Sequence, residues 1–137
     1  MTQATAPTAT AAAARPALPD LAAMRESADL FLGPDCVPEV LPAADDEVTA
    51  YTATLRGHLE FLIPELERAV ARLPRDSVPR YCALACIGEA RGKLRAQASS
   101  RHGGPVGHAR RLARVLRALC DHYQTATTGQ PCRGQDR

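Results

Sequence analysis

Residues 46–73, Asp46-EVTAYTATLRGHLEFLIPELERAVAR-Leu73, decide the fold class of this chain. When residues are placed about 100° apart around a helix axis, the large aliphatic side chains of this stretch fall on one side. They are Val48, Leu55, Leu59, Leu62, Leu66, Val70 and Leu73. A stripe wider than about 100° is typical of a helix that packs on a core. The stretch therefore predicts a long amphipathic helix within a helical bundle.

Pro64 lies inside this stretch and cannot donate a hydrogen bond to the carbonyl of Glu60. The apolar stripe keeps its register on both sides of the proline, which predicts one helix with a kink instead of two helices. Asp45, Asp46 and Glu47 place negative charge at the start of the helix, where the helix dipole favours it.

Three further segments show helical periodicity. They span residues 21–32, about 79–98 and about 106–124. Asp20 is placed to cap the first of them, and Asp76 or Ser77 the second. The predicted fold class is all-α: a small antiparallel bundle of three main helices plus a short N-terminal helix.

The chain has 137 residues, a length typical of one domain. Residues 1–18 and 125–137 contain few large apolar side chains, which predicts a disordered arm and a disordered tail around a bundle domain at 19–124. The stretch 33–45, GPDCVPEVLPAAD, has three prolines and no period, which predicts an extended connection over the bundle.

The start of the chain lacks the basic and continuous apolar segments of a secretory signal. No window approaches the roughly 18 apolar residues of a membrane span. Five cysteines leave one unpaired in any full disulfide scheme, and none lies in a zinc-ribbon pair. The sequence therefore predicts a cytoplasmic protein with reduced thiols and no membrane partner.

Charge is distributed unevenly along the chain. Residues 20–67 hold eleven acids and two arginines, a balance of −9, whereas residues 68–137 hold fourteen bases and four acids, a balance of +10. The preferred interpretation is that acidic and basic helices lie side by side. The alternative is that the basic half attracts an anionic partner such as nucleic acid or a phosphorylated metabolite.

The third predicted helix is apolar or small around most of its circumference, which predicts that it is the central helix. One of its faces carries Tyr81, Ala85, Gly88 and Gly92. Each of these glycines costs about 1 kcal/mol relative to alanine inside a helix. Close packing of another helix against them is the preferred explanation, and a ligand lying against bare backbone is the alternative.

Arg91 projects from this helix beside its main apolar face, so it is expected to be buried and paired with a carboxylate. Glu65 of the long helix is the expected partner, in a polar cluster with Tyr51 and His58. A structural ion pair is preferred. The alternative is a binding or catalytic site, which would also include Glu89.

Cys82 and Cys86 lie one helical turn apart, a spacing that lets two thiolates share a metal ion. Cys120 and His122 point in nearly opposite directions on their helix, so further ligands would have to come from elsewhere. Buried cysteine acting as a small apolar residue is the commoner case. The sequence predicts no catalytic residue, no metal site and no cofactor.

Arg110, Arg114 and Arg117 form one face of the last predicted helix, which is able to lie along phosphates. The chain has no tryptophan and few aromatic residues, so a base-stacking platform is not expected. A solvated arginine face, partly neutralised by Asp121, is the preferred interpretation.

The run PRYCALACIGEARGKLR, followed by ARRLARVLRALCDHY, resembles a family of small uncharacterised actinobacterial helical proteins labelled as natural-product biosynthesis proteins. The resemblance covers roughly residues 46–123. It implies a biological setting and not a reaction, and it supplies no catalytic residue.

These observations predict a non-enzymatic accessory or regulatory protein that acts through helix surfaces, with a protein partner or by self-association. The first alternative is an anion- or nucleic-acid-binding protein that uses the arginine face. The second is a small enzyme with a polar site between helices.

Overall fold

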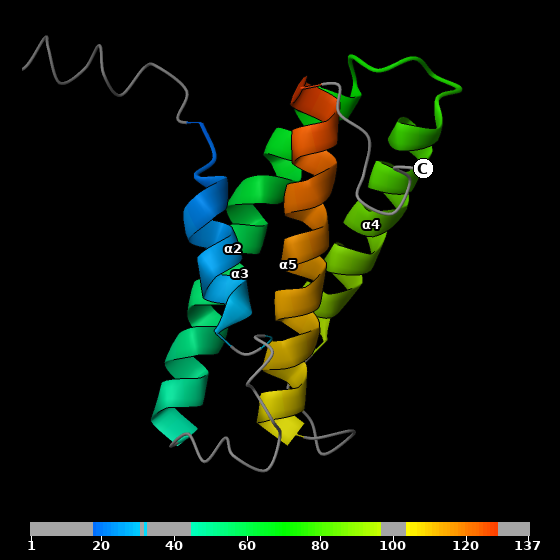
Figure 1. Cartoon of the computed structure of the whole chain (residues 1–137). Helices are drawn as coiled ribbons and strands as arrows, with labels where there is room; N and C mark the ends of the chain where they lie inside the picture. The colour runs from blue at the N-terminus through cyan, green and yellow to red at the C-terminus, as the bar shows by residue number, and fades with distance from the viewer. Residues whose placement is uncertain (1–17, 31, 33–44, 97–103, 129–137) are drawn as a thin grey trace, which may run out of the picture.

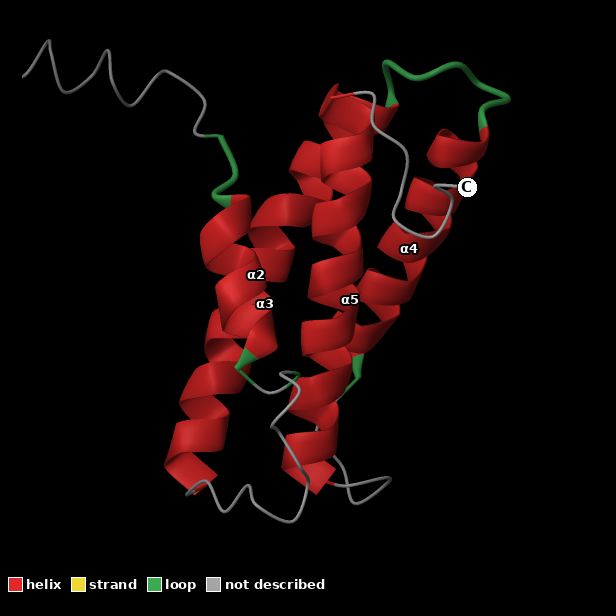
Figure 2. Ribbon diagram, viewed as in Figure 1, coloured by secondary structure: helices red, strands yellow, loops and turns green. Residues whose placement is uncertain are grey.

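Four α-helices make up the part of the chain that the computed structural model describes, residues 18–30, 32, 45–96 and 104–128. They are α2 (Leu21–Asp29), α3 (Asp45–Val70), α4 (Val78–Arg95) and α5 (Gly104–Thr128). Successive helices run in opposite directions and pack side by side (Figure 1). None of the described residues forms a strand (Figure 2). The predicted all-α antiparallel bundle with a short N-terminal helix is confirmed.

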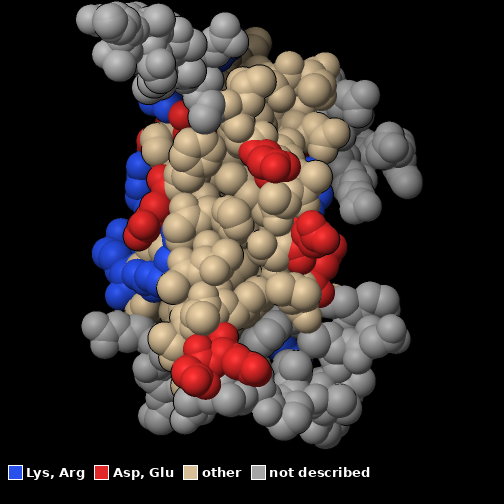
Figure 3. All heavy atoms as spheres, turned by 90° about the vertical axis from the view of Figure 1, so that its left-hand side faces the viewer, with Lys and Arg blue, Asp and Glu red and all other residues tan. Residues whose placement is uncertain are grey.

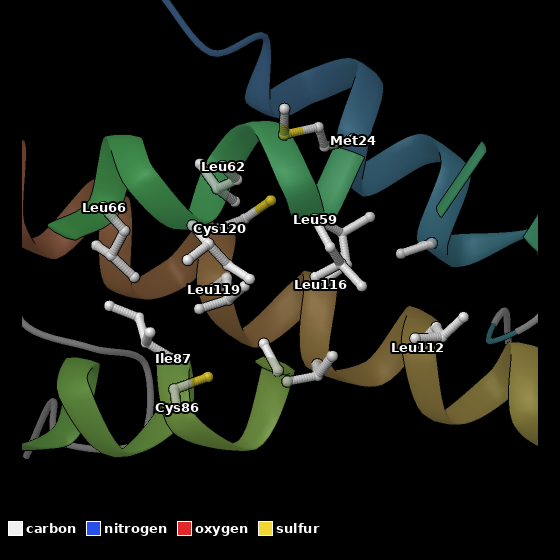
Figure 4. Packing of buried hydrophobic residues seen from close by; sticks show 14 of the residues in the cluster. Met24, Leu59, Leu62, Leu66, Cys86, Ile87, Leu112, Leu116, Leu119 and Cys120 are labelled. Carbon is white, nitrogen blue, oxygen red and sulfur yellow. The ribbon is translucent and has the colours of Figure 1, made fainter. Parts of the chain in front are cut away.

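The long helix α3 buries the apolar stripe that its sequence predicts. Leu55, Leu59, Leu62 and Leu66 are fully buried and form the largest part of its core face. Figure 4 shows Leu59 and Leu62 near Leu116 and Leu119 of α5, and Leu66 near Ile87 of α4. Full burial of one leucine side chain stabilises a fold by about 1.5–3 kcal/mol, so this face contributes much of the packing energy. The helix continues through Pro64, as predicted.

Helix α5 is the central helix of the bundle, and the prediction that α4 occupies this place is wrong. Helix α5 contacts α2, α3 and α4, and Figure 4 shows Leu119 of α5 between labelled side chains of α3 and α4. Helix α4 buries only Ala83, Cys86, Ile87 and Ala90. Alanine and glycine carry too little apolar area to require burial, so small residues around a helix do not by themselves place it at the centre.

Local capping signals set the starts of α2 and α4, as predicted. The Asp20 side chain accepts a hydrogen bond from the Ala23 amide at the start of α2, and Ser77 caps α4 in the same way. The helix ends differ from the prediction. Helices α2, α3 and α4 each end about three residues early, whereas α5 continues to Thr128 and buries Thr125. Residues 125–128 therefore belong to the bundle and not to a disordered tail.

The predicted arm and the proline-rich connection lie outside the described residues, apart from Leu18 and Asp45 at their ends. The same holds for the tail from residue 129 onward. No described helix is both long enough and apolar enough to cross a membrane.

Ion pairs join the acidic first half of the chain to its basic second half. Arg91 of α4 pairs with Glu67 of α3, and Arg117 of α5 pairs with Asp29 of α2. Figure 3, which faces the α2 and α3 side of the bundle, shows basic and acidic side chains next to each other along one edge. The prediction that acidic and basic helices lie side by side is confirmed.

Candidate functional site

Arg91 lies on the surface of α4, and the predicted buried pair with Glu65 is wrong. The Arg91 side chain is 47% exposed, and its Nη2 lies 2.8 Å from Oε2 of Glu67. Glu65 forms an ion pair with Arg68 of the same helix. The exposed Glu89 likewise pairs with Lys93 within α4. Because α4 lies at the edge of the bundle, a long side chain beside its apolar face reaches solvent with its charged end.

Tyr51 and His58 do lie together, at the contact between α2 and α3, without Arg91 or Glu65. The Tyr51 hydroxyl donates to the carbonyl oxygens of Ser27 (2.5 Å) and Ala28 (3.2 Å). Carbonyls in the last turn of a helix lack their usual partners. Tyr51 therefore completes the end of α2 and holds this short helix on α3.

His58 Nε2 lies 3.3 Å from Ser27 Oγ. A serine beside a histidine is the pair that many enzymes use for nucleophilic attack. Such a site also needs a group that orients the histidine and donors for the developing oxyanion. Within the described residues His58 forms no second hydrogen bond, and the backbone amides around Ser27 belong to the ladder of α2. The geometry fits helix docking better than catalysis.

The thiols of Cys86 and Cys120 have the properties of core residues, whereas Cys82 is half-buried. Cys86 and Cys120 are buried and form no disulfide. Burial, with a smaller effect of Glu89, raises the pKa of Cys86 to about 12, and burial raises the pKa of Cys120 to about 11. Thiolates, which attack substrates and bind metals, are thus disfavoured at neutral pH. Across the described part of the chain, no three His, Cys, Asp or Glu side chains form a group that could hold a metal ion.

The three arginines predicted to form an outer face have different surroundings. Arg117 Nη1 lies 2.8 Å from Oδ1 of Asp29, so α2 occupies one end of this face. Arg114 is exposed. Two guanidinium nitrogens of Arg110, Nε and Nη2, are buried and have no hydrogen-bond partner. The arginines therefore do not present one continuous row of accessible charges.

A cluster of basic side chains, His108, Arg111 and Arg56, lies where α3, α4 and α5 meet. Sequence reasoning missed this cluster. His108 of α5 is only 3% exposed. Its burial, together with the nearby charges of Arg111 and Arg56, lowers its pKa. Arg56 Nη2 also donates a hydrogen bond of 2.5 Å to the carbonyl oxygen of Leu94 at the end of α4. The spacing of His108 from Leu112 and Leu116 is the sequence signal for its burial.

The most distinctive exposed feature is a face of α4 that we call the α4 stripe. It consists of the exposed residues Val78, Tyr81, Leu84, Ala85 and Gly88 and the half-buried Gly92. The three large side chains are 59%, 75% and 43% exposed, respectively. A Cβ atom built on Gly88 would meet no heavy atom of the described residues within 4 Å, apart from the backbone of its own helix. The sequence indicated this small-residue face, but the helix expected to pack against it is not among the described residues.

Residues 22–128 match the model of a family of unknown function (DUF6415), and the chain belongs to that family. No curated protein matches the chain. No solved structure matches it either.

Proposed function

We propose that this member of a family of unknown function is a non-enzymatic accessory or regulatory protein that binds another protein through the α4 stripe. The main observation in support is that Val78, Tyr81 and Leu84 are exposed on one side of α4. Contiguous apolar exposure of this kind marks interaction sites. A tyrosine is well suited to such a site, because it contributes a large contact area with few rotatable bonds.

The attachment of α4 to α3 supports this proposal. Near the start of α4, Arg80 Nη1 donates a hydrogen bond of 2.8 Å to the carbonyl oxygen of Val70. Near its end, Arg56 donates to the carbonyl oxygen of Leu94. The helix is thus tied to its neighbour at both ends. A surface on a rigid element loses little conformational freedom when a partner binds.

The two alternative functions have less support. A nucleic-acid-binding face needs accessible cations, whereas Arg117 is engaged by Asp29 and Arg110 has buried nitrogens. An enzyme would require a convergent polar site, and the Ser27–His58 contact serves the docking of α2.

We also propose the setting that the resemblance implies, natural-product biosynthesis in the cytoplasm of an actinobacterium. In that setting, deletion of the gene should change the amount of a secondary metabolite. Re-expression of the native chain should restore the amount, whereas a Tyr81→Ser chain should not. Metabolite profiling of the three strains measures this.

The binding proposal is tested by placing a photo-cross-linking amino acid at Ala85 in the α4 stripe and, as a control, at Ala53 on the exposed side of α3. In the native host, position 85 should cross-link a specific protein, position 53 should not, and Tyr81→Ser should abolish the product. Identical products from both positions, or none from position 85, would contradict the proposal. Turnover of a pathway intermediate that is abolished by one substitution would also contradict it.

A further inference from the structure

We infer that the segment bound by the α4 stripe is an acidic amphipathic helix. Its apolar side chains would lie on Ala85 and Gly88, and its carboxylates on the arginines at the ends of the stripe. This inference rests on the proposed function and adds the chemistry of the partner. It follows from the charge, the arrangement of the arginines and the shape of this surface.

The chain segment that carries the stripe has an excess of basic residues. Residues 72–95 carry six basic and two acidic side chains, a balance of +4. Arg75 precedes α4 and Arg95 ends it, so the two residues bracket the stripe along the chain. Both are exposed, and neither forms an ion pair within the described residues. Unpaired guanidinium groups at the ends of an apolar surface favour carboxylates on the partner.

Arg95 lies on the stripe itself. Its Nη2 is 3.9 Å from the position that a Cβ on Gly92 would take. The guanidinium group is thus placed over the end of the apolar face, where the side chain of a docked helix would reach it. Arg91, in contrast, is already engaged by Glu67. Arg95 is therefore the residue from which the largest electrostatic contribution is expected.

The shape of the stripe fits a helix. Val78 and Gly92 lie about 21 Å apart along the axis of α4, at about 1.5 Å per residue, which matches roughly four turns of a partner helix. Ala85 and Gly88 carry almost no side chain, so the backbone of a second helix is able to approach closely between the larger residues. An apolar helix face lying on such a surface is a recurring mode of peptide recognition.

Two other occupants fit less well. A second copy of this chain would bring the unpaired Arg75 and Arg95 of one copy toward those of the other, and like charges disfavour that contact. A lipid surface would gain little from the stripe, because membrane binding scales with inserted apolar area and only Val78, Tyr81 and Leu84 of the stripe are large apolar residues. Both occupants are outcomes of the test below.

The test is a displayed library of amphipathic helices of about fifteen residues, a length that spans about 21 Å. All members share one apolar stripe, and their flanking positions vary among Glu, Gln and Lys. The library is selected on the immobilised full chain and counter-selected on the Gly88→Gln variant. We expect enrichment of Glu flanks, weaker binding at higher salt, and a loss of about fivefold in affinity for Arg95→Gln.

Gly88→Gln should block the approach of the peptide without unfolding the chain, because no described atom lies within 4 Å of the added Cβ. Its circular dichroism and melting temperature verify this. Phe61→Ser, on the exposed side of α3, should bind the selected peptides like the native chain.

Enrichment of Lys or Gln flanks would overturn the inference, as would a library without any binder that depends on Gly88. A dimer that Tyr81→Ser dissociates would also overturn it, and so would Tyr81-dependent binding to phosphatidylserine vesicles. If cross-linking at Ala85 identifies a partner whose contacting segment is not acidic, only this inference fails. If position 85 cross-links no protein, the proposed function fails as well.

Discussion

His108 connects the stability of the bundle to pH at the scale of a single residue. Burial, with the charges of Arg111 and Arg56, lowers the pKa of His108 from 6.5. Below pH 6.5 the unfolded chain therefore binds a proton more readily than the folded chain does. The free energy of unfolding should be unaffected by His108 above this pH and should fall as the pH drops below it.

The His108→Gln variant should lose part of this pH dependence. Urea unfolding at about pH 7.5 and about pH 5.5 measures it, as the difference in unfolding free energy between the two conditions. His122 keeps a contribution of the same sign in this variant, because burial lowers its pKa too. A double variant His108→Gln/His122→Gln should therefore depend on pH still less. An unchanged pH dependence in the single variant would contradict the role of His108.

Arg91 is the residue for which the structure implies a much smaller effect of substitution than the predicted buried ion pair would have. Both side chains of its ion pair with Glu67 are exposed, and such pairs contribute about 0–1 kcal/mol to the free energy of unfolding. Arg91→Leu should therefore lower the free energy of unfolding by less than about 1 kcal/mol. Glu67→Gln should have a similar effect, and the double variant should add little to either. A loss of about 3–5 kcal/mol would instead indicate a buried pair.

Helix α4, taken as an element, should become more stable when Gly88 is replaced by alanine. No described atom lies within 4 Å of the Cβ that would be added, and alanine is favoured over glycine in a helix interior by about 0.5–1 kcal/mol. Urea unfolding of Gly88→Ala should show this gain. Destabilisation would mean that part of the native fold packs closely on this glycine.

The whole molecule depends on the central position of α5. Leu116 is fully buried on this helix, which contacts each of the other three. Leu116→Ala should lower the free energy of unfolding by about 2–5 kcal/mol, because it leaves a cavity in the core. Amide hydrogen exchange should become faster in all four helices together.

Leu84→Ala on the exposed α4 stripe is the control for this prediction. It should change the free energy of unfolding by no more than about 0.5 kcal/mol. Comparable losses for Leu84→Ala and Leu116→Ala would show that the stripe belongs to the core.

Much of the fold was predictable because its signals are local. The apolar period around Leu59 and Leu66 defines the buried face of α3, and Asp20 defines the start of α2. The helix ends were predicted less well. The helical periodicity near Leu73 and Gln124 does not indicate whether a neighbouring helix covers the last turn of α3 or of α5.

The candidate site was predictable only in part. The sequence placed Tyr51 and His58 on one side of α3, and the structure brings both to α2. The sequence also indicated the face of α4 that carries Gly88, but it did not show that this face is exposed. A helical wheel orders the residues around one axis but does not identify the element that each face meets.

The amino-acid sequence by itself determined the helical segments, their core-facing residues and the caps at Asp20 and Ser77. Backbone hydrogen bonds, caps and the 3.6-residue period act between residues that are close in the chain. Only the tertiary structure decided that α5 is central, that Arg91 meets Glu67, and that the α4 stripe is exposed. These contacts join residues far apart in the chain, and their geometry depends on how the four helices pack together.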